Sequence, residues 1–280
     1  MTRLAPVLEM NDGAPIPQLG LGVMYIPDDE LPAVLAHAAA LGFRHFDTAT
    51  HYGNEAGIGE GMRRLELPRE ELFVTTKLPN AAHGYDSALR AFDRSEQAIG
   101  SIDLYLLHWP QPPKGKYRET WRAMVRLRDE GRVRSIGVCN FPEALLDELI
   151  GDTGVTPAVN QVELHPAYPQ PDMRAANTAR GILTESWSPL EHGRAIKHST
   201  ITAIAENHGC SPAAVVLRWH LDLGLVVIPK AASPAHLASN FAALDLRLTA
   251  EDHAAIAGLA RVDGGFGPDP MVHTTEQGAD

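Results

Sequence analysis

The sequence predicts a (β/α)8 TIM barrel preceded by a β-hairpin, and three observations support that fold class. Short β-rich runs alternate with amphipathic helical stretches along the chain, eight such runs can be counted, and the chain has 280 residues. Strands that alternate with helices pair in parallel through right-handed crossovers, and eight such units close a barrel. A length of about 250 residues is typical of that fold as one domain. We therefore expect residues 1–280 to form a single domain.

The expected strands are short, and most are followed by a helical stretch. In chain order the strands are Leu19–Val23, Phe43–Asp47, Phe73–Lys77, Leu104–His108, Ile136–Cys139, Ala158–Glu163, Ile182–Ser188 and Leu225–Lys230. The helical stretches include Leu31–Leu41, Glu55–Leu65, Ala88–Ile99, Tyr117–Glu130, Pro142–Ile150, Met173–Arg180 and Ala213–Leu221. A doubly wound open sheet is the alternative fold. No GxGxxG motif follows an early strand, however, and Gly20-Leu-Gly22 lacks the third glycine.

The two ends of the chain depart from this alternation. Residues 1–18 contain Asn-Asp-Gly between apolar residues, which predicts a β-hairpin that plugs one end of the barrel. Residues 261–280, RVDGGFGPDPMVHTTEQGAD, are rich in Gly and Pro. We expect this tail to be non-helical and either to fold near the barrel mouth or to stay mobile.

Composition and charge exclude several classes of partner. The chain has 24 Lys and Arg against 35 Asp and Glu, a net charge of −11, so its average field repels nucleic acid and anionic membranes. It opens without a signal-peptide pattern, and no apolar run approaches the roughly 18 residues that span a bilayer. We therefore expect a cytoplasmic protein. Cys139 and Cys210 form no CxxC motif and have no His at metal-ligand spacing, so neither a disulfide framework nor a structural zinc is expected.

Polar residues stand at the ends of the expected strands, on the face where barrel enzymes carry their active sites. They are Asp47, Lys77, His108, Asn140, Gln161 to Glu163, Ser188 and Lys230. Each alone is ordinary, since strand ends often carry caps and solvated charges. Lys77 and His108, however, close the apolar runs LFVTT and LYLL, and a charged group that ends a buried strand needs a partner. Asp47, on the adjacent strand, is the expected partner of Lys77.

Tyr52 follows Asp47 by five residues and is expected to lie within reach of this pair. A phenol with a pKa near 10 is a poor proton relay at pH 7, but a neighbouring ammonium stabilises the phenolate and lowers that pKa. We therefore expect Asp47, Tyr52 and Lys77 to act together as a tuned general acid. His108 is placed to orient a carbonyl and to stabilise negative charge on its oxygen.

Three stretches resemble the signature stretches of the aldo-keto reductases. They are GFRHFDTATHYGNEAGIG (Gly42 to Gly59), RSIGVCNF (Arg134 to Phe141) and VIPK (Val227 to Lys230). The resemblance implies reduction of aldehydes or ketones, such as dicarbonyls and keto sugars, to alcohols, with hydride from a nicotinamide. It also implies Tyr52 as the proton donor, Lys77 and Asp47 as the pair that lowers its pKa, and His108 as the residue that orients the carbonyl. The HWP loop and the GPDP near the C-terminus look most like the bacterial 2,5-diketo-D-gluconate and methylglyoxal reductase branch. Relatives suggest a monomer, which agrees with a closed barrel that exposes no sheet edge.

The resemblance implies the cofactor contacts as well. Asn140 and Gln161 match the residues that bind the nicotinamide carboxamide, and Trp187 stands where many relatives stack a Tyr on the nicotinamide ring. A place in the core is the alternative for Trp187. The residues implied along the pyrophosphate are Ser188, Pro189 and Leu190.

The stretch after Lys230 departs from the family pattern. Relatives place Ser or Thr directly after this Lys and Arg six residues after it, where both bind the 2′-phosphate of NADPH; here those residues are Ala231 and His236. Because Lys230, Ser233 and Asn240 remain, we expect NADPH as the cofactor with only a modest preference over NADH. A neutral imidazole cannot replace a guanidinium, although a protonated one restores the charge. The affinity for NADPH is then expected to fall as pH rises through about 6.5, where a histidine side chain ordinarily loses its proton.

The substrate pocket is expected to include Met24 and Trp109, with the C-terminal tail. Trp109 is equally consistent with a core residue in a tight turn before Pro110. Lys114 and Lys116 lie on the loop QPPKGKY, where they either attract acidic substrates or, more commonly for surface lysines, lie in solvent. The sequence does not select one carbonyl substrate.

Two other functions remain open. A nicotinamide-binding regulator that senses redox state keeps the fold and the cofactor contacts without turnover, but the complete Asp47, Tyr52, Lys77 and His108 set argues against it. A metal-dependent hydrolase would recruit some of the 13 histidines. No His and carboxylate set converges at the strand ends, so no metal site is expected.

Overall fold

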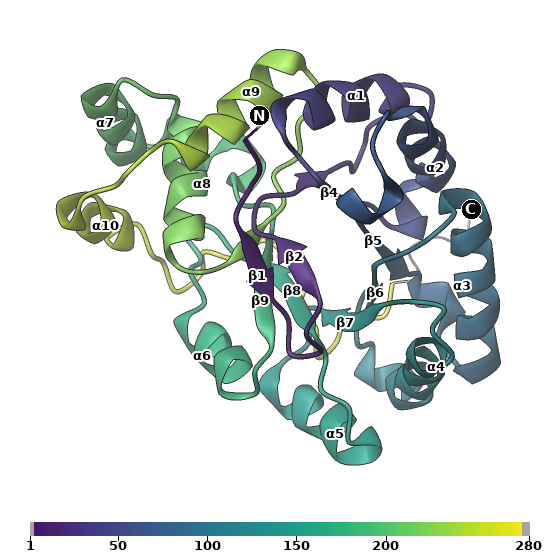
Figure 1. Cartoon of the computed structure of the whole chain (residues 1–280). Helices are drawn as coiled ribbons and strands as arrows, with labels where there is room; N and C mark the ends of the chain where they lie inside the picture. Colours follow the sequence, from purple (N-terminus) through teal and green to yellow (C-terminus); the bar gives the residue numbers. More distant parts are fainter. Residues whose placement is uncertain (1–2, 276–280) are drawn as a thin grey trace.

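The computed structural model describes residues 3–275, and at its centre is a sheet of eight parallel strands (Figure 1). The strands lie in chain order from β3 at one edge to β10 at the other. Parallel bridges from Leu19 to Val227 and from Gly22 to Lys230 join these two edges, so the sheet closes. The predicted barrel is therefore confirmed. Its strands are β3 Leu21–Gly22, β4 His45–Asp47, β5 Phe73–Leu78, β6 Leu104–Leu107, β7 Ser135–Cys139, β8 Val159–Glu163, β9 Leu183–Trp187 and β10 Val226–Val227.

The two strands at the closing seam are shorter than the sequence predicts. β3 and β10 have 2 residues each, within the predicted runs Leu19–Val23 and Leu225–Lys230. Isolated bridges join them in place of a continuous ladder. Pro229 lacks an N–H group, so it cannot donate to the ladder beyond Val227.

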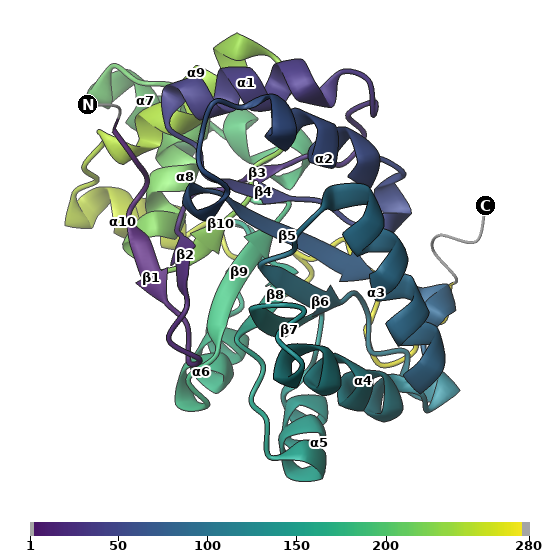
Figure 2. The ribbon, with the colours of Figure 1, turned by 45° about the vertical axis from the view of Figure 1, so that its right-hand side comes forward.

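Helices surround the barrel, as the view in Figure 2 shows. They are α1 Leu31–Leu41, α2 Glu55–Arg64, α3 Tyr85–Ile99, α4 Tyr117–Asp129, α5 Glu143–Thr153, α6 Pro171–Ala179, α7 Ser199–His208, α8 Pro212–Asp222, α9 Pro234–Phe241 and α10 Ala250–Ala257. Two of them lie outside the eight strand-helix repeats. α7 precedes α8 between β9 and β10, and α10 follows the last repeat.

The N-terminal hairpin closes one end of the barrel, as predicted. It consists of β1 Val7–Glu9 and β2 Pro15–Pro17, which pair antiparallel and lie in front of the barrel strands in Figure 1. Met10, Ala14 and Ile16 are buried in one cluster with Phe73 and Leu104, which begin β5 and β6. The hairpin therefore packs against the amino ends of the strands and leaves the carboxyl ends for a site.

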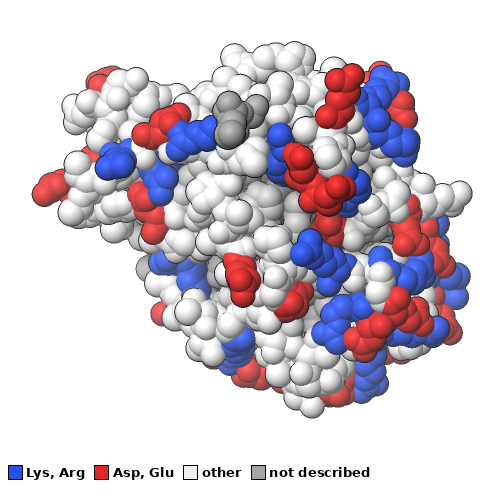
Figure 3. Space-filling model, viewed as in Figure 1, with Lys and Arg blue, Asp and Glu red and all other residues white. Residues whose placement is uncertain are grey.

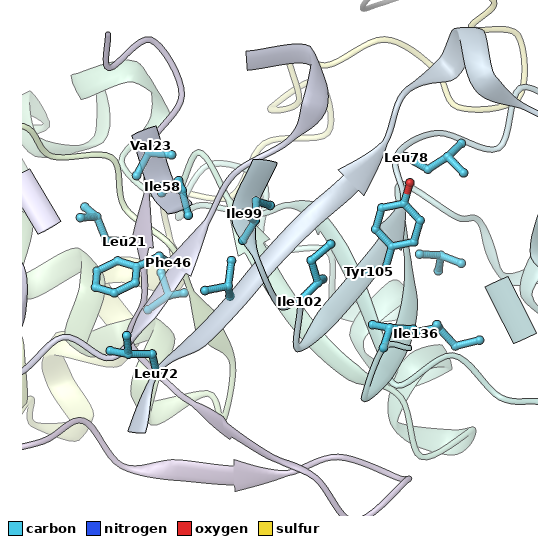
Figure 4. Packing of buried hydrophobic residues seen from close by; sticks show 14 of the residues in the cluster. Leu21, Val23, Phe46, Ile58, Leu72, Leu78, Ile99, Ile102, Tyr105 and Ile136 are labelled. Carbon is cyan, nitrogen blue, oxygen red and sulfur yellow. The ribbon is translucent and has the colours of Figure 1, made fainter. Parts of the chain in front are cut away.

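Side chains along each strand point alternately outward and inward, which separates an apolar outer layer from a polar interior. Outward side chains such as Leu21, Phe46 and Tyr105 pack with Ile58 of α2 and Ile99 of α3 in the main hydrophobic core (Figure 4). The intervening residues point the other way because strand side chains alternate with a period of two. The buried polar side chains that result include His45, Asp47, Thr75, Lys77, Gln161 and Glu185.

Charged side chains of both signs lie intermixed on the outer surface. On the face shown in Figure 3 they gather over α3 and α4, where Arg122 pairs with Asp152 and Arg132 with Asp93. Exposed pairs of this kind contribute at most about 1 kcal/mol each. Within residues 3–275 no helix combines the length and the apolar character that crossing a bilayer requires.

Candidate active site

A buried ion pair lies at the carboxyl end of the barrel interior. Asp47 ends β4 and Lys77 lies near the end of β5, and both are 1 % exposed. The Lys77 Nζ atom donates to Asp47 Oδ1 at 2.6 Å and to the Thr48 carbonyl at 2.9 Å. Burial lowers the pKa of Lys77, but the charge of Asp47 outweighs it and raises the pKa above its ordinary value. The ammonium is therefore charged at neutral pH, and the predicted pairing is present.

Tyr52 lies beside this pair on a short 3-10 helix, Thr50–Tyr52, that follows β4. The hydroxyl of Thr50 donates to the Lys77 carbonyl at 3.2 Å, which ties this turn to β5. The Nζ atom of Lys77 lies 5.2 Å from the centroid of the Tyr52 ring. Phenol and ammonium thus meet where the sequence predicts.

The pKa of Tyr52 differs from the predicted direction. Burial raises it to about 12, against the lowering effect of the Lys77 charge. The expectation of a pKa below the ordinary value was wrong for the protein alone, because removing the phenolate from water costs more than the one ammonium returns. Tyr52 is consequently a neutral phenol that keeps its proton at pH 7.

His108 follows β6 and faces Tyr52 edge to face. The two ring centroids are 6.5 Å apart at an interplanar angle of 81°. Burial, followed by the charge of Lys77, lowers the pKa of His108 well below its ordinary value. Its Nδ1 atom is buried with no hydrogen-bond partner among the described residues. At neutral pH the imidazole is uncharged and carries one N–H group, which it can donate to an oxygen atom.

A second buried carboxyl group, Glu185 in β9, extends this network and was not predicted. The Nε2 group of Gln161 donates to Asp47 Oδ2 at 2.9 Å and to Glu185 Oε2 at 2.8 Å. Burial and then the negative charge of Asp47 raise the pKa of Glu185 to about 8. His45 lies 3.8 Å from this carboxyl group and is neutral, because burial lowers its pKa to about 3. An acid in the middle of a predicted strand was the available sequence signal.

A cleft of about 620 Å³ opens above the network. Of the sequence-predicted residues, its lining includes Asp47, Tyr52, His108, Asn140, Gln161, Trp187, Ser188, Pro189, Leu190, Lys230, His236, Asn240, Met24 and Trp109. Lys77 and Ser233 are not part of the lining. Lys77 lies beneath it, and the hydroxyl of Ser233 caps α9 by accepting from the His236 N–H at 3.2 Å.

Asn140 and Trp187 are joined inside the cleft. The Trp187 indole Nε1 donates to Asn140 Oδ1 at 2.8 Å, while Asn140 Nδ2 donates to the His108 carbonyl at 3.2 Å. Asn140 has φ +62° and Ser188 φ +49°, a left-handed conformation that Asn adopts readily but that is strained for Ser. Such strained backbone is concentrated at functional sites.

The far end of the cleft differs in chemistry. Lys230 and His236 are exposed there beside the first turn of α9. Helix N-termini present free backbone N–H groups and a positive partial charge, which favour an anion. Ala231 is 2 % exposed and lies in the core.

Several lining residues were not predicted individually. Phe266, Gly267 and Pro268 come from the C-terminal tail, which has no helix or strand between residues 261 and 275. His192, Gly193 and Ile196 come from the loop after β9. The ring of His273 lies 4.6 Å from that of Trp109. The Gly-rich composition of the tail indicated a non-helical segment, but no pattern identified which residue enters the cleft. The part of the tail from 276 to 280 lies outside the described residues.

The arrangement combines a neutral phenol, a charged ammonium and a neutral imidazole around one opening. These groups can deliver a proton to an oxygen atom that develops negative charge and can stabilise that charge. Across the described residues there is no group of three His, Cys, Asp or Glu side chains arranged to hold a metal ion.

Comparison with known proteins identifies a family for these features. The model of the aldo/keto reductase family matches residues 18–261. Methylglyoxal reductase DkgA of Escherichia coli strain K12 is 42 % identical, over 94 % of this chain and 96 % of its own. Morphine 6-dehydrogenase of Pseudomonas putida is 44 % identical, over 96 % of each chain. The crystal structure of a point mutant of Gox0644 in complex with NADPH has a TM-score of 0.92 and 45 % identity, covering 96 % of this chain and 98 % of that one.

The raised pKa of Glu185 predicts a dependence of stability on pH. Between the ordinary value of 4.5 and about 8, the folded protein holds a proton that the unfolded chain has lost. The free energy of unfolding therefore falls as pH rises through this window, by up to about 1.4 kcal/mol per pH unit from this group. Urea unfolding of the wild type and of Glu185→Gln across the window measures the difference, which removes the contribution of other groups such as His45. The exposed control Glu66→Gln should show the same dependence of stability on pH as the wild type. The same dependence in Glu185→Gln would contradict this assignment.

Proposed function

The chain belongs to the aldo/keto reductase family and reduces aldehydes or ketones with NADPH, and we propose that Asp47, Tyr52, Lys77 and His108 perform the proton transfer. The observation that carries this proposal is the contact of the Lys77 ammonium with Asp47 beside the phenol of Tyr52. A regulator without turnover is not supported, since the relatives over nearly the whole chain are named reductases and dehydrogenases.

Tyr52 acts as the general acid in this proposal. Its raised pKa keeps the phenol protonated throughout the physiological range. The alkoxide that develops on a reduced carbonyl is more basic than a phenolate, so the proton moves from Tyr52 to the substrate oxygen. Lys77 stabilises the phenolate that remains, and Asp47 keeps Lys77 in place through the bond of 2.6 Å. Solvent then returns the proton to Tyr52 through the open cleft.

His108 orients the carbonyl. A neutral imidazole donates one hydrogen bond and adds no fixed positive charge to the pocket. Its ring lies 6.5 Å from that of Tyr52, so both side chains could contact one substrate oxygen. A hydrogen-bond donor directed at the oxygen that develops negative charge stabilises the transition state more than the bound substrate, and therefore lowers the barrier.

The residues along the cleft fit NADPH from end to end. When bound, the cofactor supplies hydride to the carbonyl carbon. The amides of Asn140 and Gln161 and the indole of Trp187 would hold its nicotinamide end. Ser188, Pro189 and Leu190 would follow its pyrophosphate, and Lys230, Ser233, His236 and Asn240 would hold its 2′-phosphate end. The indole is already fixed by its bond to Asn140, so little order is lost when a flat ring stacks on it.

The substrate class is best described as neutral carbonyl compounds, including dicarbonyls. In the described part of the lining, Lys230 is the only Lys or Arg side chain, and it belongs to the phosphate end. Lys114 and Lys116 are not among the lining residues. Met24, Trp109 and Phe266 provide apolar walls. A substrate carboxylate would therefore lose its hydration without gaining a charged partner.

We also propose that the enzyme works in the cytoplasm as a monomer. Cys139 and Cys210 are both free thiols, as a reducing compartment favours. The closed barrel leaves no sheet edge that needs a second copy.

Replacing the proposed acid provides the first test. We expect Tyr52→Phe to lower kcat by about 10²- to 10⁴-fold, the usual contribution of a general acid. The NADPH dissociation constant should stay near that of the wild type, because the phenol is not among the proposed cofactor ligands. Steady-state reduction of phenylglyoxal and a fluorescence titration with NADPH measure the two quantities. Wild-type turnover in Tyr52→Phe would refute the assignment.

The departure at the phosphate end predicts the cofactor preference. We expect the dissociation constants of the wild type to show only a modest preference for NADPH over NADH, because the imidazole of His236 cannot make the bidentate contact of a guanidinium with the 2′-phosphate. His236→Arg restores a guanidinium at this position. That variant should bind NADPH about tenfold more tightly at pH 8 and NADH equally well. A large preference for NADPH in the wild type would contradict the prediction.

The Lys77 ammonium beside Tyr52 is already paired with Asp47, and the one Lys or Arg in the described lining, Lys230, lies at the phosphate end, so we expect discrimination against acidic substrates. We expect the kcat/KM for an α-keto ester to exceed that for the corresponding α-keto acid by at least about tenfold. A tenfold ratio corresponds to about 1.4 kcal/mol, and removing a carboxylate from water without a charged partner costs more than that. Ethyl benzoylformate and benzoylformate share one ketone and form a matched pair. Equal efficiency toward the two compounds would show that an anion site has been missed.

A further inference from the structure

The tail segment from Arg261 to Pro268, here called the C-terminal strap, crosses the carboxyl end of the barrel. It begins where the Arg261 N–H donates to the Ala167 carbonyl at 3.0 Å. It ends in the wall of the cleft, which Phe266, Gly267 and Pro268 help to line. The strap therefore spans from the loop after β8 to the site itself.

One buried carboxylate holds the strap. Glu163, the last residue of β8, is 5 % exposed. Its Oε1 atom accepts from the Phe266 N–H at 2.9 Å, and its Oε2 atom accepts from the Gly267 N–H at 2.7 Å. His165 contacts Oε1 at 3.0 Å. Burial raises the pKa of Glu163, but these hydrogen bonds outweigh it and hold the pKa below its ordinary value, so both oxygens accept at neutral pH.

The glycines of the strap are required by its closeness to the barrel. A Cβ atom on Gly264 would lie 2.0 Å from the Ala167 carbonyl oxygen. On Gly267 it would lie 2.8 Å from Glu163 Oε2 and 3.0 Å from the Trp187 indole. At Gly267 the backbone therefore lies so close to the Glu163 carboxylate and the Trp187 indole that only glycine fits without a shift of these neighbours.

The Phe266 ring joins the strap to two parts of the cleft. It stacks on His165 at 5.5 Å and meets the Trp187 ring edge to face at 5.8 Å. It also lies 4.7 Å from the His192 ring and 5.3 Å from the guanidinium of Arg194. His192 lines the cleft next to the residues proposed for the pyrophosphate. One side chain therefore supports both the indole and the loop after β9.

From these contacts we propose that Glu163 is a positioning residue that clamps the strap onto Trp187 and the loop of His192 and Arg194, so that bound NADPH leaves only when the strap lifts. The inference rests on the proposed function, because it takes Trp187 as the support for the nicotinamide. Glu163 acts through backbone N–H groups and Phe266, and it takes no part in the proton transfer.

The rate of NADPH release tests this role directly. In Glu163→Gln the amide presents an N–H₂ group toward one of the two backbone donors, so at most one of the two bonds survives. We expect NADPH to leave about tenfold faster, as for the loss of one hydrogen bond to a charged group. Phe266→Leu, which keeps the strap backbone but removes the ring stacking, should release NADPH faster as well. Stopped-flow displacement, followed by the fluorescence of bound NADPH, measures the rates, with Glu66→Gln as the exposed control.

One further measurement, on Trp187→Leu, separates the possible failures. If Glu163→Gln and Phe266→Leu release NADPH at the wild-type rate, the clamp is overturned, even where their melting temperatures fall. Trp187→Leu tests the underlying assignment through the NADPH dissociation constant. An unchanged constant in Trp187→Leu would overturn the proposed cofactor contact, and the clamp that rests on it. If Trp187→Leu binds NADPH more weakly while Glu163→Gln and Phe266→Leu release it at the wild-type rate, the clamp alone is overturned.

Discussion

The ion pair between Asp47 and Lys77 is the interaction on which the site depends, and two neighbouring strands of the barrel hold it in the interior. Two charges removed from water stabilise each other only when their geometry is good and their remaining hydrogen bonds are made. β4 and β5 provide that geometry because they are neighbours in register and their alternate residues point inward. Lys77 is held by Asp47 and the Thr48 carbonyl, and Asp47 by Lys77 and Gln161. A pair so fully bonded contributes more to the position of the ammonium beneath Tyr52 than to stability.

The surrounding groups avoid further charge in the interior. Glu185 and His45 are neutral near pH 7 because burial shifts their pKa values to about 8 and about 3. His108 is neutral for the same reason. The Lys77 ammonium therefore stands beside Tyr52 with one carboxylate partner and no competing charge, and the phenol keeps its proton until a more basic oxygen is close. The half of the cleft that we propose for the cofactor is arranged separately, through Asn140, Trp187 and the strap held by Glu163.

Most of the fold and the centre of the site could be predicted from the sequence, because alternating strands and helices leave few topologies and the strand ends collect polar residues. Lys77 and Asp47 were recognisable because charges at the ends of apolar runs need partners. The direction of the pKa shift of Tyr52 was not recognisable, since it depends on how deeply the ring is buried. Glu185 and Phe266 escaped for related reasons. The partner of Glu185 and the position of Phe266 in the cleft both depend on contacts between segments far apart in the sequence. No local sequence pattern encodes such contacts.

The central claim is that Tyr52 holds its proton against Lys77 because burial dominates. The most direct measurement is an ultraviolet difference titration of tyrosinate, comparing the wild type with Tyr52→Phe under alkaline conditions where both stay folded. The account predicts that Tyr52 ionises near pH 12, above the ordinary value of 10.0. A tyrosinate signal present in the wild type, absent from Tyr52→Phe and titrating below that ordinary value would contradict it.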